Sequence, residues 1–272
     1  MSDVALDTPE LARFYDRISD AQFQLGLSLI DRLGVKGGES VLDVGCGTGR
    51  LALKVSEIVG ANGSVTGIDP SPHRIEIARE KLNFDPRSNV HFTIGEAEDL
   101  DLFPEASLDV VYYSSVFHWI SGRAKALEEA YRVLKPGGRV GITTPSPDGF
   151  PRELRTMIRK IMAGTEYASR DRGIKSQSVL ITADELEALF RSTRFANLRL
   201  EVGERRSFHQ SAWEVIAFYE ASSFGNLLSF LPAGMRDRMT GDIINELEKK
   251  RTADGIEIVS RTIFATAEKD LS

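Results

Sequence analysis

The feature of this 272-residue sequence that most restricts its fold is a regular alternation of short apolar runs with amphipathic helical segments between residues 38 and 145. Strands that alternate with helices in this way build βαβ units, whose strands lie parallel in one sheet. The pattern therefore predicts an α/β fold. The five runs, each bounded by Gly, Pro, Asp or Asn, are SVLDV (40–44), SVTGI (64–68), VHFTI (90–94), LDVVYY (108–113) and RVGITT (139–144).

The segments between the runs carry clear helix signals. Ser71 stands at an N-cap position and Pro72 at the first helical position, ahead of apolar residues that share one face. In residues 123–134 apolar side chains recur at helical spacing until Pro-Gly-Gly at 136–138 turns the chain into the fifth run. We expect these helices to cover the sheet.

The chain leaves this pattern twice after residue 145. Between the two departures, Thr182 and Glu185 form a capping-box signature at the start of a helix that leads to a strand at 197–203. A last strand is predicted at 256–267, and it can return antiparallel because it follows the sixth strand directly. The departures are predicted to form a helical cap over the crevice, where substrate is selected.

Six segments follow from this organisation. They are an N-terminal helical lid at 1–37, a cofactor-binding α/β core at 38–145, a cap insertion at 146–181, a continuation of the core at 182–207, a helical cap insertion at 208–252, and the last core strand with the C-terminus at 253–272.

Composition excludes several classes of function. With 34 basic and 40 acidic residues the formal net charge is -6, so we predict no nucleic acid partner. The single cysteine, Cys46, excludes an intrachain disulfide and a cysteine-based metal site, and it fits a reducing compartment, so we expect a cytoplasmic protein. The first ten residues lack an apolar leader, and no apolar run approaches the roughly 18 residues that span a bilayer, so no membrane span is predicted.

The first apolar run leads directly into the loop Asp43-Val44-Gly45-Cys46-Gly47-Thr48-Gly49, after which a helical pattern begins. Glycines let the backbone turn sharply and approach a ligand without a Cβ in the way. The helix N-terminus adds unpaired N–H groups and the positive end of the dipole, so the turn can receive a carboxylate or a phosphate. By itself, the loop is also compatible with a tight turn that binds nothing.

Polar residues close the next three runs. Asp69 ends the second run 20 residues after Gly49, where nucleoside-binding βαβ units place an acceptor for ribose hydroxyls. Glu96 and Ala97 follow the third run, where a carboxylate can accept a hydrogen bond from an adenine amine, and Ser114 closes the fourth. Because the carboxyl ends of parallel strands meet at one edge of a sheet, these residues are predicted to face one crevice.

With these motifs the sequence resembles the class I S-adenosylmethionine-dependent methyltransferases. The resemblance is to the small-molecule branch, which includes the menaquinone/ubiquinone C-methyltransferases, trans-aconitate methyltransferase and malonyl-carrier-protein methyltransferase. It covers residues 38–145 and rests on VLDVGCGTG (41–49), GIDPSP (67–72), GEAEDLDLFPEASLDVV (95–111), SSVFHWI (114–120) and ALEEAYRVLKPGG (126–138).

The resemblance implies a Rossmann-like sheet of seven strands, mostly parallel with the last antiparallel, and helices on both faces. It also implies S-adenosylmethionine as the methyl donor, S-adenosylhomocysteine as the product and no metal. The matching positions place Asp43, Gly45, Cys46, Gly47 and the Ser114 carbonyl around methionine, Asp69 at the ribose, Glu96 and Ala97 at adenine, and Pro70 in the cofactor site. The resemblance also suggests that Tyr15 lies in a lid over the pocket, and the alternative is that its helix is ordinary core. Glu96 stands where an aspartate is common, so its reach toward the base is longer.

His118 is the candidate catalytic residue. It follows Ser114 by four residues, at the mouth of the predicted crevice, where an imidazole can take a proton from an attacking hydroxyl, amine or carbon acid. The alternative is that His118 and Trp119 only pack the loop, since well-aligned methyl transfer needs no obligatory acid or base.

The substrate is less restricted by the sequence. Arg152, Arg155 and Arg159 share a helical face that can bind a carboxylate or phosphate or can face solvent. Aromatic residues of 208–252 can line an apolar pocket or fill a core. We therefore predict a small-molecule substrate, acidic or apolar.

Two other functions remain as alternatives. One is a subunit or sensor that binds the cofactor without catalysis. The other is a nicotinamide-dependent oxidoreductase, although the loop has the spacing G-x-G-x-G rather than G-x-G-x-x-G.

Overall fold

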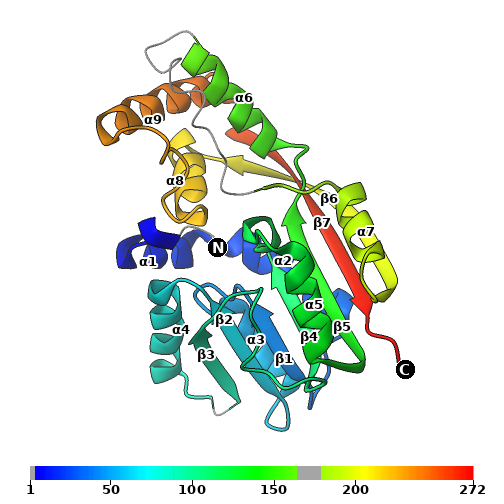
Figure 1. The fold of residues 1–272 in the computed structure, drawn as a ribbon. Coiled ribbons are helices and arrows are strands. Elements are labelled where there is room, and N and C mark those ends of the chain that lie inside the picture. The colour runs from blue at the N-terminus through cyan, green and yellow to red at the C-terminus, as the bar shows by residue number, and fades with distance from the viewer. Residues whose placement is uncertain (1–3, 88, 164–178, 272) are drawn as a thin grey trace.

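The computed structural model describes residues 4–87, 89–163 and 179–271, which build a seven-stranded sheet with helices on both faces (Figure 1). The strand order is β3-β2-β1-β4-β5-β7-β6. Strands β1 to β5 pair in parallel, whereas β7 runs antiparallel to both of its neighbours. The predicted α/β architecture, mostly parallel with the last strand antiparallel, is confirmed.

The strands are β1 (Ser40–Val44), β2 (Ser64–Asp69), β3 (Val90–Ile94), β4 (Leu108–Ser114), β5 (Leu134–Pro145), β6 (Ala196–His209) and β7 (Ile256–Glu268). The helices are α1 (Pro9–Ile18), α2 (Asp20–Leu33), α3 (Arg50–Val59), α4 (Pro72–Phe84), α5 (Arg123–Val133), α6 (Phe150–Ala163), α7 (Ala183–Arg191), α8 (Ala212–Ser222) and α9 (Ala233–Glu248), with short 3-10 turns at Val4–Leu6 and Phe117–Trp119.

Two apolar clusters hold helices to the two faces of the sheet. Successive residues of a strand point to opposite faces, so Val41 packs with α2, α3 and α4, whereas Leu42 packs with α5 and α7. Both side chains are fully buried, as expected for a parallel sheet covered on both sides. The predicted helix starts are present: Ser71 accepts the N–H of Arg74, and both bonds of the Thr182 capping box form.

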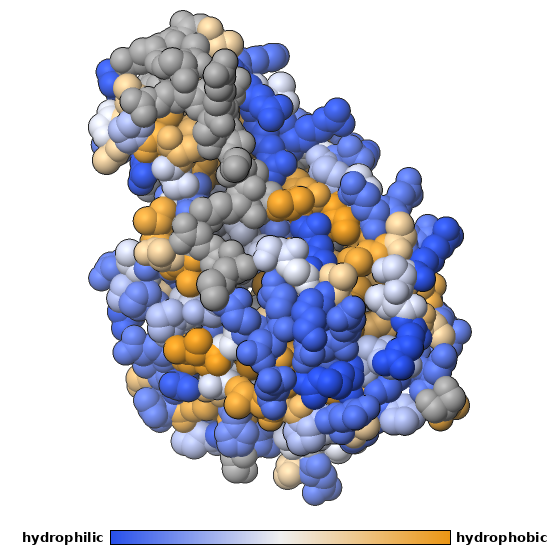
Figure 2. Space-filling view, in the orientation of Figure 1, coloured by the Kyte–Doolittle hydropathy of each residue, from blue (hydrophilic) through white to orange (hydrophobic). Residues whose placement is uncertain are grey.

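The cap has an apolar core of its own. Leu154 and Ile158 of α6, Ile216 of α8 and Ile243 of α9 are buried together with Ile258 at the start of β7. Figure 1 shows these three helices at one end of the molecule, around the ends of β6 and β7. Figure 2, drawn in the orientation of Figure 1, shows that the face toward the viewer is mainly hydrophilic, with separate apolar patches.

Strand β6 is much longer than the predicted strand at 197–203. It pairs with β7 as far as His209 opposite Ile256, so the first residues of the segment 208–252 are strand rather than helix. Most of its side chains are exposed or half-buried, which removes the apolar alternation that marks a strand in sequence. The pairing is instead supplied by β7, in which the residues from Thr262 to Ala265 are all buried. Residues 164–178 of the predicted cap insertion lie outside the described residues.

The N-terminal segment is tied to the sheet through a buried ion pair. Arg74, in the first turn of α4, donates from Nε to the Asp7 carboxylate at 3.0 Å, and both side chains are almost fully buried. The Ser71 hydroxyl donates to the same Asp7 oxygen at 2.7 Å. Arg74 also donates to the Ala221 carbonyl at the end of α8, so one guanidinium joins the N-terminus, the sheet and the cap.

Within the described ranges, no helix is long and apolar enough to cross a membrane.

We predict that Arg74→Met lowers the free energy of unfolding by about 3–5 kcal/mol, because it leaves the Asp7 carboxylate buried without its counter-charge. Urea unfolding at pH 7 measures the change. Asp7→Asn combined with Arg74→Met should recover part of the loss, because no buried charge then remains. Arg13→Met, which removes an exposed ion pair with Glu80, should change stability by less than about 1 kcal/mol. A single Arg74→Met variant as stable as Arg13→Met would contradict the prediction.

Candidate functional site

The site forms where the strand order reverses, between β1 and β4, at the carboxyl edge of the sheet. Open α/β sheets bind ligands at this position because the connections from the two strands diverge to opposite faces. The loop after β1 turns sharply there, with the N–H groups of Gly45 and Cys46 both donating to the Ile68 carbonyl of β2. Gly45 has φ +74°, and a Cβ on it would lie 2.3 Å from Cγ2 of Val116, so the turn admits only glycine.

Asp43, at the end of β1, is a buried carboxylate without a hydrogen-bond partner. It is 1% exposed, and in the described part of the chain neither of its oxygens accepts a hydrogen bond. Burial raises the pKa of Asp43 to about 7, the nearby Tyr112 hydroxyl works against this rise, and the charge of Asp69 adds to it. Buried acceptors in folded proteins are normally satisfied, so this carboxylate is suited to a ligand that brings donors.

Asp69, at the end of β2, is held by backbone groups. The Gly47 N–H donates to one of its oxygens and the Ser71 N–H to the other, both at 2.9 Å. Burial raises the pKa of Asp69, while the Arg74 charge and the two N–H donors lower it. Each oxygen keeps a free lone pair, so an oriented acceptor for further donors remains at this strand end.

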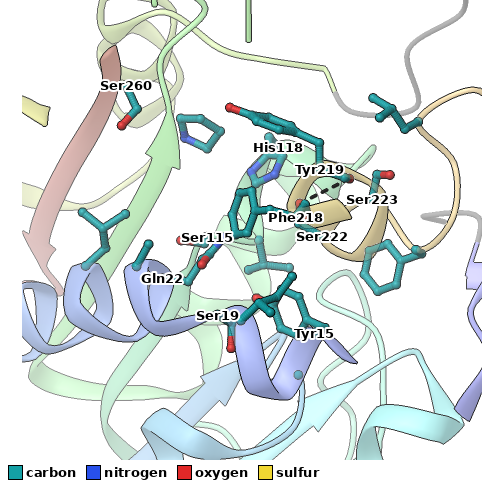
Figure 3. Close-up of a pocket in the computed structure, with 18 of the residues that line it drawn as sticks. Tyr15, Ser19, Gln22, Ser115, His118, Phe218, Tyr219, Ser222, Ser223 and Ser260 are labelled. Carbon is teal, nitrogen blue, oxygen red and sulfur yellow. Dashed lines mark hydrogen bonds between the residues drawn. The ribbon is translucent and has the colours of Figure 1, made fainter. Parts of the chain in front are cut away.

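A cavity of about 820 Å³ lies between this edge of the sheet and the cap. It brings together most of the residues singled out in the sequence, which are Tyr15, Asp43, Gly45, Cys46, Gly47, Asp69, Ser114 and His118. The volume falls within the usual range of about 300–1,000 Å³ for small-molecule sites. Figure 3 shows His118, Phe218 and Tyr219 grouped at the cap end and Tyr15 and Ser19 of the N-terminal segment at the other.

Three predicted residues do not line this cavity. Pro70, Glu96 and Ala97 stand just beyond the ends of β2 and β3, and the cavity stops at Asp69. Glu96 is half-buried beside Glu98, and burial followed by the Glu98 charge raises its pKa. The adenine role implied for Glu96 and Ala97 stays a prediction.

The loop and the N-terminal helices hold one another. The Tyr15 ring reaches within 3.8 Å of the place where a Cβ of Gly47 would stand, so α1 covers the loop. Asp16, the next residue, accepts hydrogen bonds from the Thr48 hydroxyl and from Lys81. Cys46 also lines the cavity, but its sulfur lies against Gly67 of β2, and burial raises the pKa of the thiol well above the ordinary value and keeps it protonated.

His118 lies in the 3-10 turn after β4, at the boundary between the core and the cap. Its Nδ1 is 3.4 Å from the Thr144 hydroxyl, and its ring lies 5.0 Å from that of Trp119. Burial, and after it the charges of Arg123 and Arg155, lower the pKa of His118 to about 3. The imidazole is therefore neutral at physiological pH, with a nitrogen able to accept a hydrogen bond.

Sequence reasoning missed two groups of cavity residues. Arg74 carried a signal, since a cation in the first turn of a helix opposes the helix dipole and implies a specific partner. Arg205, Ser207 and His209 gave none, because polar residues at every second position of an exposed strand look like a loop.

Among the residues with described positions, no group of three or more His, Cys, Asp or Glu side chains could hold a metal ion.

Comparison with known proteins assigns the chain to a family. A family model described as a methyltransferase domain matches residues 35–214, well over half of the chain. The demethylmenaquinone methyltransferase of Lactococcus lactis is 41% identical over 176 residues, which are 60% of this chain and 68% of that protein. The arsenite methyltransferase of Halobacterium salinarum is 38% identical over 116 residues, which are 41% of this chain but only 29% of that protein.

A solved structure shares the fold. Phosphoethanolamine N-methyltransferase 2 of Haemonchus contortus, in complex with S-adenosyl-L-methionine, superposes with a TM-score of 0.61 at 20% identity, over 97% of this chain and 57% of that one. The resemblance seen in the sequence is confirmed, and the chain belongs to the methyltransferase-domain family of S-adenosylmethionine-dependent enzymes.

Proposed function

We propose that this protein transfers the methyl group of S-adenosylmethionine to a small molecule bound between the sheet edge and the cap. The observation that carries the proposal is Asp43: a fully buried carboxylate with no partner in the described chain, beside a glycine loop, opening into a cavity that the cap closes. An unpaired buried charge destabilises a protein, so its presence at this position supports a ligand that brings a positive group.

The residues present fit this cofactor. Asp43 would accept hydrogen bonds from the α-ammonium group of its methionine part, and Gly47, which carries no side chain, leaves room beside it for that part of the ligand. Asp69, oriented by the Gly47 and Ser71 amides, would accept from the ribose hydroxyls. When bound, the cofactor supplies an electrophilic methyl group on a sulfonium sulfur.

The protein itself positions the two reactants and excludes water from them. Tyr15 and α1 cover the loop on one side, and α8 brings Phe218 and Tyr219 over His118 on the other. Well-oriented reactants reach effective molarities of roughly 10⁵–10⁸ M, so alignment in such an enclosure supplies most of the rate. His118, kept neutral by its surroundings, would accept a hydrogen bond from the acceptor and orient its nucleophilic atom, since a pKa of about 3 makes the ring a weak base.

The relatives are named for different methyl acceptors, and the cysteine content of this chain fits some of these acceptors better than others. The Lactococcus protein is named for demethylmenaquinone and the Halobacterium protein for arsenite. Arsenite is held by several thiolates, whereas Cys46 is the only cysteine of this chain and its thiol is protonated. We therefore propose an organic acceptor, with residues 1–37 as the lid and the two insertions as the cap that selects it. The cytoplasmic location stays a prediction.

We predict that Asp43→Asn weakens binding of S-adenosylmethionine at least tenfold, since hydrogen bonds to a charged group contribute about 1.5–3 kcal/mol. Titration calorimetry of the purified protein measures the affinity. Asp31→Asn, on α2 and outside the cavity, is the control and should bind normally. Equal affinity of the Asp43→Asn variant and the wild type would remove the assignment.

The same substitution should stabilise the ligand-free protein at high pH. Because the folded pKa of Asp43, about 7, lies above its ordinary value of 3.8, the folded state binds the extra proton between these values. Its contribution to stability is therefore complete below about pH 4 and is lost as the pH rises through 7. Urea unfolding should show Asp43→Asn gaining stability over the wild type at pH 8 and gaining less at pH 5. A gain independent of pH would contradict this.

For His118 we predict that His118→Ala lowers turnover at least tenfold while affinity for the cofactor is unchanged. The matched control is His91→Ala, an exposed histidine of β3 outside the cavity, which should leave turnover unchanged. Rates come from transfer of a labelled methyl group to acceptors in a cell extract. Unchanged turnover in His118→Ala would leave the ring with its packing role only.

A further inference from the structure

The wall of the cavity formed by β6 and β7 presents one polar face. Arg205, Ser207 and His209 alternate along β6 and all line the cavity. On β7, Ser260 lies opposite Arg205 and Ile258 lies opposite Ser207. Ser260 and Ile258 also line the cavity. The Ser207 hydroxyl lies 3.1 Å from Nε2 of His209, so hydroxyl and imidazole groups adjoin the guanidinium on this wall.

Helix α6 contributes a second group of cations. Arg155 and Arg159 lie one turn apart, and both line the cavity together with Leu154 and Ile158 of the same helix. Burial lowers the pKa of Arg155, and the Arg159 charge lowers it further, which places the two guanidinium groups within each other's field. The Arg155 charge also acts on His118, so this group stands close to the proposed transfer position.

Carboxylates balance some of the cations that line the cavity. Arg50 pairs with Asp20 at 2.6 Å, and Arg261 of β7 pairs with Glu204 at 3.1 Å. In the ranges that the structure covers, neither Arg159 nor Arg205 forms an ion pair with a carboxylate. Glu214 of α8, which also lines the cavity, accepts the backbone N–H of Gln210. The cap end of the cavity is thus positively charged, whereas the loop end carries Asp43 and Asp69.

The remaining walls at the cap end are apolar. The lining side chains there, beyond those of α6, are Trp213, Val215, Phe218, Phe224, Leu227 and Phe230. A ligand that fills this space must therefore contact aromatic and aliphatic side chains and also interact with guanidinium groups.

We propose that the acceptor is a small organic anion, with an apolar body against the cap helices and a carboxylate or phosphate group attracted by the arginines that line the cavity, Arg159 of α6 and Arg205 of β6. The proposal rests on the proposed function and names the substrate class of the same site. Guanidinium groups suit both anions because their N–H donors match two oxygen atoms at once. An anion also relieves the repulsion among the arginines that face the cavity.

The test is binding of a panel of aryl and alkyl carboxylates and phosphate monoesters, each paired with its neutral amide or alcohol, to the full chain saturated with S-adenosylhomocysteine. Calorimetry should find acids that bind at least tenfold more tightly than their neutral partners, with the carboxylate and phosphate arms showing which anion is preferred. Arg159→Gln combined with Arg205→Gln should remove this difference while binding of S-adenosylhomocysteine is unchanged.

Arg152→Gln is the matched control, since Arg152 lies on the same helix, pairs with Asp148 and does not line the cavity. It should bind the acids as the wild type does. Neutral partners that bind as well as every acid, or acid binding that survives in the double variant, would overturn the inference. The proposed function fails separately, by absence of S-adenosylmethionine binding or of methyl transfer to any acceptor.

Discussion

Two carboxylates buried at one edge of a parallel sheet define this molecule. Asp43 and Asp69 end neighbouring strands, both are nearly inaccessible to water, and burial raises the pKa of each. For Asp69 the Arg74 charge and two backbone amides oppose this rise, whereas for Asp43 only the nearby Tyr112 hydroxyl does. Such a pair is unfavourable for folding and is retained where a ligand compensates it. The glycine turn, the covering helix α1 and the cap all surround this one electrostatic feature.

The sheet could be predicted because its signals are local. Alternation of apolar runs and helices, the Ser71 cap and the Thr182 capping box each depend on a few adjacent residues, and the structure contains all of them. The strand-end residues could be predicted for the same reason, since parallel strands align their carboxyl ends. Eight of the predicted site residues meet in one cavity, whereas Pro70, Glu96 and Ala97 lie outside it.

The remaining features depend on contacts between distant segments. Strand β6 continues to His209 because β7 offers a partner, although the β6 sequence lacks apolar alternation. Arg74 is buried because Asp7, 67 positions earlier, meets it together with the rings of Tyr15 and Phe224, 4.4 Å and 3.9 Å from its guanidinium carbon. No short window of sequence contains these partners. Neither the β6 side of the cavity nor the attachment of the N-terminal segment could therefore be predicted from a local pattern.

The separate apolar core of the cap has a consequence for how such proteins diversify. The buried residues of α6, α8 and α9 form a cluster separate from the one beneath the glycine loop, and the two sides meet at the contact between Arg74 and the end of α8. The paired strands β6 and β7 extend from the sheet into the cap. Their backbone hydrogen bonds hold the cap in place on the sheet whichever side chains line its inner surface. Residues on the inner surface of these helices can therefore change over evolution while the strand ends and the glycine loop keep their own core.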